Sequence, residues 1–342
     1  MQAPKKILAT VACFVALATS SVDAAYTQLT VFGDSLADAG NVFLFSGGLF
    51  PPSPPYAQDL SNGPVAVQVL AANLVLPLTP SLAGGRDYAF GGAETGMGNY
   101  FAILPGVPPE INALFSGPPN FPATGVLAQI QAFQAGGGTI APTELTVLWA
   151  GPNDIFRALQ LGQDLSSTVV TAVNNLAFET MLLYASGART ILLPNMANLG
   201  HIPFGLGSPD PAGLTTLSAG FNAALAQAIP ALEGLLPGLN IIGFDTFSFV
   251  DAAIANPGAF GFTNVTDPCF NGVTVCANPD QYVFWDLVHP TARSHELLGN
   301  AFAAAVVPEP ATLALCAIAL AAIGFARRRA VRGGSQRRPR GL

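Results

Sequence analysis

Ser35 is the residue in this sequence whose surroundings best suit a nucleophile. It lies in the stretch Val31-Phe-Gly-Asp-Ser-Leu-Ala-Asp-Ala-Gly-Asn41, where a short apolar run gives way to small and polar residues. The run, Leu29 to Phe32, is typical of a buried first strand. Reactive groups of open α/β sheets gather at the carboxyl ends of strands, because backbone groups and helix N-termini converge there. A serine in such a turn can also cap a helix, so its role depends on partners elsewhere in the chain.

A serine nucleophile needs a general base within hydrogen-bond reach, and this chain has three histidines. His289 follows Asp286 by three residues, just before a predicted helix. In such a turn the carboxylate can return to the imidazole Nδ1–H, fix its tautomer and stabilise the imidazolium that forms during catalysis. An Asx-turn aspartate beside a helix-capping histidine has the same spacing. His201, in a loop of Gly and Pro, is a less favoured base, and His295 is predicted to lie on the surface of the last helix.

Acyl transfer also needs hydrogen-bond donors aimed at the oxygen that becomes negative in the transition state. The backbone N–H of Ser35, the backbone N–H of Gly92 and the side-chain amide of Asn153 each follow a different predicted strand. Glycine lets the backbone approach a substrate closely, and Gly91 is the alternative to Gly92. Each of these residues alone is typical of a turn. Together with the Asp–His pair they are the parts that an acyl-transfer site requires.

The elements that must position these residues alternate between strands and helices. Segments typical of strands occupy about residues 29–32, 86–90, 145–149, 190–193 and 240–245. Helical patterns occupy about 64–74, 126–135, 166–186, 215–236 and 290–305. Pro230 is expected to kink or end part of the fourth helix. The alternation predicts one α/β domain whose parallel sheet is covered on both faces.

The beginning of the chain has the pattern of a secretory signal peptide. Residues 1–25 contain two lysines, an uncharged apolar run and small residues at a plausible cleavage site. A buried N-terminal helix is the alternative. We therefore expect an exported protein whose folded domain spans residues 26–306.

The other end of the chain has three parts. Pro308-Glu-Pro310 precedes sixteen uncharged residues, which Arg327-Arg-Arg329 follow. A helix of that length would be about 24 Å long, short for a bilayer core of about 30 Å. Residues 307–330 resemble the PEP-CTERM sorting signal of Gram-negative bacteria, and an ordinary membrane anchor is the alternative. The resemblance implies an exosortase as partner, transient anchoring in the inner membrane and a cytoplasmic basic tail over 331–342.

The segment between these signals is strongly acidic. Residues 26–306 hold four basic and eighteen acidic side chains, a net charge of −14. Such a surface repels phosphate backbones, so nucleic acid is not an expected partner. The several His and Asp ligands of a metallophosphoesterase are not visible in the sequence, and neither a metal nor a cofactor is expected.

Two cysteines fall in this segment. Cys269 and Cys276 lie in the run Pro-Cys-Phe-Asn-Gly-Val-Thr-Val-Cys. In an oxidising compartment this spacing favours a small loop-closing disulfide over two free thiols.

The motifs together resemble those of the SGNH hydrolases, also called GDSL lipases/esterases. Phe32-Gly-Asp-Ser-Leu-Ala-Asp-Ala-Gly-Asn41, Tyr88-Ala-Phe-Gly-Gly-Ala93, Gly151-Pro-Asn-Asp154 and Asp286-Leu-Val-His289 match the first, second, third and fifth blocks of that family. The resemblance covers Leu29 to Ala305. It implies a flavodoxin-like three-layer α/β/α sandwich with a parallel sheet of about five strands. It also implies a catalytic Ser35, Asp286 and His289, with an oxyanion hole formed by Ser35, Gly92 and Asn153.

We therefore expect a secreted or surface-attached serine esterase or lipase that acts on a small-molecule or lipid ester. The Phe-rich loops over about 42–50 and 101–121 suggest an apolar acyl site. A deacetylase of extracellular or cell-surface polysaccharide would use the same catalytic residues. A non-catalytic matrix or adhesion protein is an alternative of another class, because the sorting tail and the acidic surface suit it as well.

Overall fold

The computed structural model describes residues 26–307. A four-stranded parallel sheet runs through this part of the chain in the order β1, β2, β3 and β4. The strands are β1 (Leu29–Gly33), β2 (Leu145–Trp149), β3 (Thr190–Pro194) and β4 (Asn240–Phe244). Because the order in space follows the order in sequence and every pair is parallel, all four carboxyl ends lie at one edge of the sheet.

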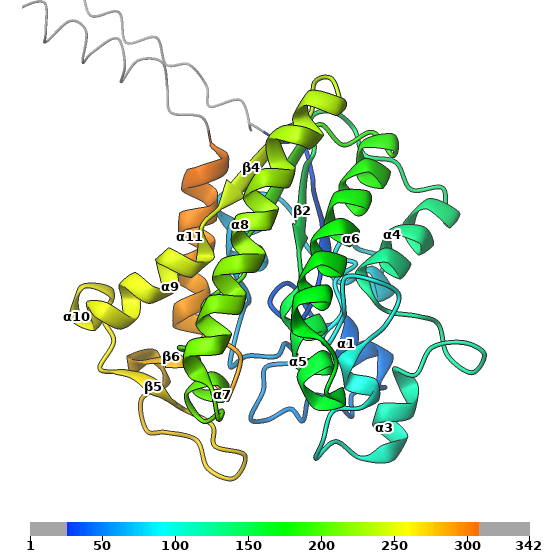
Figure 1. The fold of residues 1–342 in the computed structure, drawn as a ribbon. Helices are drawn as coiled ribbons and strands as arrows, with labels where there is room; N and C mark the ends of the chain where they lie inside the picture. Colours follow the sequence, from blue (N-terminus) through cyan, green and yellow to red (C-terminus); the bar gives the residue numbers. More distant parts are fainter. Residues whose placement is uncertain (1–25, 308–342) are drawn as a thin grey trace, which may run out of the picture.

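Helices cover both faces of this sheet, as predicted for a three-layer α/β/α sandwich (Figure 1). One face is covered by α2 (Ala66–Asn73) and α11 (Ala292–Val306), which pack against each other. The other face is covered by α4 (Val126–Ala135), α6 (Leu165–Ala185) and α8 (Pro211–Leu235). The remaining helices are α1 (Asn41–Phe45), α3 (Pro109–Leu114), α5 (Pro152–Leu161), α7 (Pro203–Leu206), α9 (Thr246–Ala255) and α10 (Pro257–Phe260). Short 3₁₀ turns span Ser81–Ala83, Tyr100–Ala102 and Pro279–Gln281.

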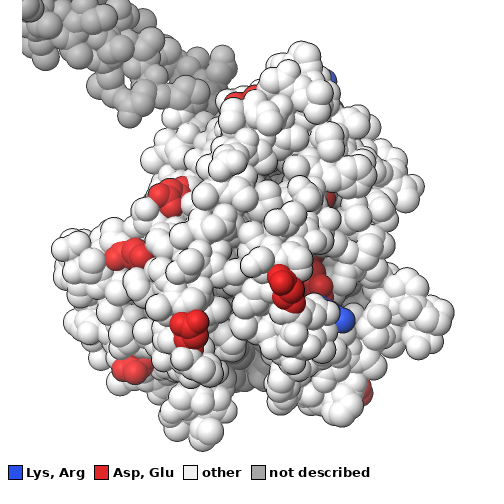
Figure 2. All heavy atoms as spheres, viewed as in Figure 1, with Lys and Arg blue, Asp and Glu red and all other residues white. Residues whose placement is uncertain are grey.

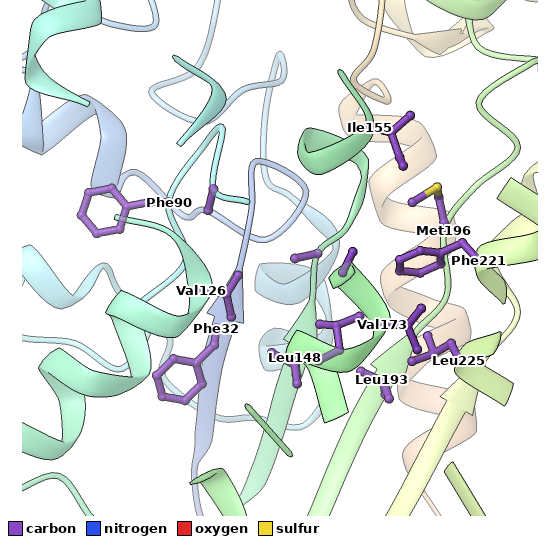
Figure 3. Close-up of a cluster of buried hydrophobic side chains, with 14 of the residues drawn as sticks. Phe32, Phe90, Val126, Leu148, Ile155, Val173, Leu193, Met196, Phe221 and Leu225 are labelled. Carbon is purple, nitrogen blue, oxygen red and sulfur yellow. The ribbon is translucent and has the colours of Figure 1, made fainter. Parts of the chain in front are cut away.

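The alternation of side chains along the strands explains the two layers. In β1, Val31 packs with the cluster under α2 and α11, whereas Phe32 packs with the cluster under α4, α6 and α8. Successive side chains of a strand point to opposite faces, so a strand that is apolar throughout is buried on both sides. Figure 3 shows the larger cluster, which extends from Phe32 past Leu148 to Phe221.

The segment over residues 86–90 was predicted to be a strand, and it is a less regular one. It runs beside β1 with a single parallel bridge between Val31 and Asp87. Its backbone continues this pairing, since Tyr88 N–H donates to Val31 O at 2.8 Å and Phe90 N–H donates to Gly33 O at 3.1 Å. The segment thus extends the four regular strands toward the expected five.

A small second sheet lies outside the main one. It pairs β5 (Asn264–Pro268) with β6 (Tyr282–Phe284) in parallel. The strand β5 was not predicted, because its residues are mostly polar and none of them is buried. Cys269 and Cys276 directly follow β5 and are joined by a disulfide with an S–S distance of 2.03 Å.

Of the two expectations for Pro230, a kink or an end of the helix, the end is contradicted. α8 continues through Pro230 to Leu235. Proline removes one helical N–H, but Pro230 is exposed, so water can satisfy the carbonyl that loses its donor.

The predicted signal peptide, sorting segment and basic tail lie outside the described residues. Within residues 26–307, no helix has both the length and the apolar character to cross a membrane.

Candidate active site

Ser35 lies in the turn directly after β1, at the carboxyl edge of the sheet, and is 6% exposed. The residue at the end of β1 anchors this turn, because the backbone of Gly33 exchanges two hydrogen bonds with the side-chain amide of Gln129, at 3.0 and 2.8 Å. Asp34 N–H donates to Trp149 O at the end of the neighbouring strand β2. A Cβ at Gly33 would collide with that same carbonyl oxygen, so the close approach of β1 and β2 requires glycine there.

Asp286 and His289 form the pair that their spacing predicts. The Asp286 Oδ2 atom lies 2.8 Å from His289 Nδ1, and Oδ1 accepts from the backbone N–H groups of Val288 and His289 at 2.8 and 2.7 Å. The carboxylate therefore holds both the backbone turn and the ring, which leaves Nε2 for another partner. The Asx-turn interpretation and the catalytic one are both satisfied by this single geometry.

The electrostatics of this pair favour a charged couple. Burial by itself would raise the pKa of Asp286, but the His289 charge and three hydrogen bonds outweigh it and hold this pKa below its usual range. Burial would likewise lower the pKa of His289, yet the charges of Asp286 and Asp34 and the hydrogen bond to Asp286 raise it above 6.5. Such a histidine can accept a proton readily.

Residues far away in sequence brace the His289 turn. The Ser61 hydroxyl donates to Pro290 O at 2.8 Å, and Asn62 Oδ1 accepts from Ala292 N–H at 2.7 Å. These two residues begin the stretch Ser61-Asn-Gly-Pro64, which lies shortly before α2. They fix the start of α11 and, with it, the position of His289.

Tyr56 is a neighbour of this pair that the sequence analysis missed. Its hydroxyl donates to Asp286 Oδ2 at 2.8 Å, the same oxygen that faces His289 Nδ1. Burial and the charge of Asp286 raise the pKa of Tyr56, so the phenol keeps its proton. The ring packs edge-on against Phe270 and Trp285, next to the disulfide loop. Nothing local could have indicated this contact, because 230 residues separate its two members.

Three N–H groups near Ser35 have no acceptor within residues 26–307. The backbone N–H groups of Ser35 and Gly92 make no hydrogen bond there, and Asn153 uses one amide hydrogen on Ala93 O at 3.0 Å, which leaves the other free. Gly91 differs, because its N–H donates to Asp38 Oδ2 at 2.8 Å. The Gly91 donor is occupied, so the chemistry favours Gly92 of the two glycines.

Gly92 can only be glycine in this conformation. Its φ of +74° is a left-handed conformation that other residues rarely adopt. A Cβ there would also strike the Phe101 ring and Asn99 Oδ1.

A cavity at the carboxyl edge of the sheet lies beside Ser35. Ser35 and Asn153 line it, as do Val288 and Pro290 on either side of His289. Asp34 also lines it, and burial raises the pKa of this carboxyl to about 7, with the Leu36 N–H bond and His289 opposing the shift. The Ser35 hydroxyl and the His289 ring make no direct hydrogen bond in the described part of the chain. Such contacts are often long in the absence of substrate.

The other two histidines lie in different surroundings. The prediction that His295 is a surface residue is wrong, since α11 packs its side against α2 and leaves His295 1% exposed. Its Nδ1 accepts from Ala66 N–H at 3.2 Å, and burial, assisted by the charge of His289, lowers its pKa to about 3. His201 is partly exposed and pairs with Asp251, whose Oδ1 lies 2.7 Å from His201 Nδ1.

The described residues contain no group of three or more His, Cys, Asp or Glu side chains that could hold a metal ion. The buried acids near the site instead serve the backbone. Asp38, for example, accepts from the N–H groups of Gly40, Asn41 and Val42 as well as from Gly91.

Two known sequence families match parts of this chain. The sequence model described as GDSL-like Lipase/Acylhydrolase matches residues 29–302, and the PEP-CTERM protein-sorting motif matches residues 306–330. That motif indicates export through a sorting system with exosortase-type processing and a C-terminal membrane anchor.

Individual relatives are distant. An uncharacterized protein in the trpE-trpG intergenic region of Pseudomonas putida is 28% identical over 88% of this chain, which spans about half (52%) of that protein. A GDSL esterase/lipase of Arabidopsis thaliana is 26% identical over 79% of this chain and 83% of its own length. A solved structure from the lipolytic G-D-S-L family of Veillonella parvula is 14% identical and covers 82% of this chain and 97% of its own, with a TM-score of 0.42.

The family match extends over most of the chain, from the first strand to the last helix, and includes every block that carries the residues at the cavity. The chain belongs to the GDSL-like lipase/acylhydrolase family.

Proposed function

We propose that this protein is an exported serine hydrolase that cleaves carboxylic ester bonds, with Ser35, His289 and Asp286 as its triad. The observation that carries the proposal is the Asp286–His289 pair at 2.8 Å beside a cavity that Ser35 lines. The name of the Arabidopsis thaliana relative, a GDSL esterase/lipase, supports the same class of reaction.

The proposed reaction needs only groups of this chain and water. The Ser35 hydroxyl oxygen attacks the acyl carbon while His289 Nε2 takes the hydroxyl proton. The carbonyl oxygen becomes negative and is held by the free N–H groups of Ser35, Gly92 and Asn153. The alcohol leaves with the proton from His289. Water then attacks the acyl-enzyme by the same route, releases the acid and restores Ser35.

The location follows from the sorting motif. We propose that an exosortase processes the segment after residue 306 and that the hydrolase domain acts at or beyond the surface of a Gram-negative cell. The visible face of the domain is largely uncharged with scattered acidic side chains and few Lys or Arg (Figure 2), which disfavours polyanionic substrates.

The proposal is tested by treating the purified protein with a fluorophosphonate probe and with p-nitrophenyl butyrate. A serine hydrolase labels with the probe and hydrolyses the ester. A matrix or adhesion protein of the same fold would do neither, and that outcome would contradict the proposal.

Asn153→Ala is expected to lower kcat for p-nitrophenyl butyrate by about 10²–10³-fold, the usual loss for one oxyanion donor. KM should change little, because the donor acts on charge that develops only in the transition state. Asn73→Ala is the matched control, since Asn73 is an exposed residue paired only with Asn300. A kcat within twofold of wild type in Asn153→Ala would remove this residue from the proposed oxyanion hole.

Tyr56→Phe is expected to lower kcat by about three- to tenfold, because a hydrogen bond to a charged group is lost. Without the phenol hydrogen bond, more of the negative charge on Asp286 acts on His289. The pKa of His289 therefore rises, and the acidic limb of the pH–rate profile moves to higher pH. Tyr184→Phe, which loses a hydrogen bond to Pro237 O at the far end of α6, is the matched control. A drop in rate with an unmoved pH limb would show that Tyr56 only supports the loop.

A further inference from the structure

The cavity that Ser35 lines is mainly apolar. Beyond Ser35 and Asn153 its walls are mainly apolar, from Leu36, Trp149, Phe156, Leu199, Ile202, Val250, Phe284, Val288 and Leu298. Its volume is about 50 Å³. The one other hydroxyl at its wall is Thr246, whose Oγ1 is buried without a partner in the described residues.

A second cavity, of about 30 Å³, adjoins the first. Val250, Phe284, Pro290 and Leu298 line both, so the two spaces are direct neighbours. The second is bounded by α9, α10, β6 and α11. No charged residue lines it, and its single hydroxyl, on Ser294, is already bonded to Val283 O at 2.7 Å.

The Phe-rich loops that the sequence suggested for an acyl site are used differently. Phe45 packs on Phe90 and Phe115, and Phe101 packs on Phe50 and Phe115. These rings fill one another's space and do not line either cavity. The apolar space next to Ser35 lies instead on the side of α9 and α11.

We propose that these two cavities form the binding path for the acyl chain of the substrate, which rests on the proposed esterase function. The chain begins at the carbonyl on Ser35, passes Val250 and Leu298, and ends against Ala253 and Phe260. An apolar chain gains by leaving water for such walls, whereas a sugar hydroxyl would lose its hydrogen bonds there. The preferred substrates are therefore esters of medium-chain fatty acids.

The size of the two cavities, about 50 and 30 Å³, limits the length of the chain. Each buried methylene should raise kcat/KM by about three- to fourfold until the end of the second cavity is reached. Hexanoyl and octanoyl esters are thus expected to be hydrolysed best, and acetyl esters poorly.

The test is a profile of kcat/KM for p-nitrophenyl esters from acetate to laurate, measured on the full chain and its variants. Ala253→Phe fills the second cavity and is expected to lower octanoate hydrolysis at least about tenfold while butyrate stays within about twofold. Phe260→Ala enlarges the cavity and should move the optimum toward decanoate. Ala252→Phe, an exposed neighbour on the same helix, is the matched control and should keep the wild-type profile.

The outcomes separate the two proposals. Hydrolysis with an acetate optimum in the wild type, or with the same profile in both Ala253→Phe and Phe260→Ala, would overturn the acyl path and leave the esterase intact. No hydrolysis of any ester by the wild type would overturn the esterase proposal itself. Because the two variants shift the optimum in opposite directions, a general loss of folding in one of them cannot imitate the expected result.

Discussion

Ser35→Ala is expected to lower kcat for p-nitrophenyl butyrate by about 10⁴–10⁶-fold and to abolish labelling by a fluorophosphonate. The hydroxyl oxygen is the atom that becomes covalently bound to the acyl group, so no partial replacement is possible. The remaining rate would come from substrate binding and the oxyanion donors alone.

The loss should be catalytic and leave folding unchanged. The Ser35 hydroxyl makes no hydrogen bond within residues 26–307, so its removal should change the free energy of unfolding by no more than about 0.5 kcal/mol. Thermal unfolding measures this directly. Ser116→Ala, at an exposed serine bonded only to Ala113 O, is the matched control for substitution of a serine. A labelled or active Ser35→Ala variant would exclude Ser35 as the nucleophile.

His289→Ala is expected to cost nearly as much as Ser35→Ala, because members of a triad act as a unit. His201→Ala is a demanding control. It removes another histidine that is paired with a carboxylate at a similar distance, 2.7 Å, but outside the Ser35 turn. We expect that variant to keep wild-type rates. Equal losses in the two variants would show that a nearby His–Asp pair, and not this particular base, supports the reaction.

The pH dependence follows from the same pair. The base must be neutral to accept the Ser35 proton, so activity rises with pH through the pKa of His289, which lies above 6.5 because Asp286 and Asp34 stabilise the imidazolium. Asp286→Asn removes one of these charges. The midpoint of the rise should then move to lower pH while kcat falls by about 10⁴-fold.

Much of the fold follows from local patterns in the sequence. The helix over 126–135 and the strand over 145–149 have in the structure the bounds that were predicted. Buried strands and amphipathic helices are specified by the local period of their apolar residues, so they can be read from a short window. The Asp286–His289 contact belongs to the same class, because three residues in one turn fix its geometry.

Other features depended on which segments pack together. His295 looks like a surface residue in its own helix, and only the packing of α11 on α2 buries it. The apolar character of Phe45 and Phe101 is likewise evident from the sequence. Their packing against other aromatic rings is not, and neither is the position of the apolar space at Ser35 beside α9 and α11. The sequence shows that a side chain is apolar, whereas the tertiary structure determines which other side chains it contacts.

The site shows the same division at the level of single atoms. The residue types at Ser35, Gly92, Asn153 and His289, together with their places after successive elements, make them candidates for catalysis. The free donors and the support of the carboxylate depend on long-range contacts. Gly91 donates its N–H to Asp38, 53 residues away, and Tyr56 donates to Asp286 across 230 residues. Local sequence determines which polar groups a turn carries, but long-range hydrogen bonds determine which of these groups are free to bind a substrate.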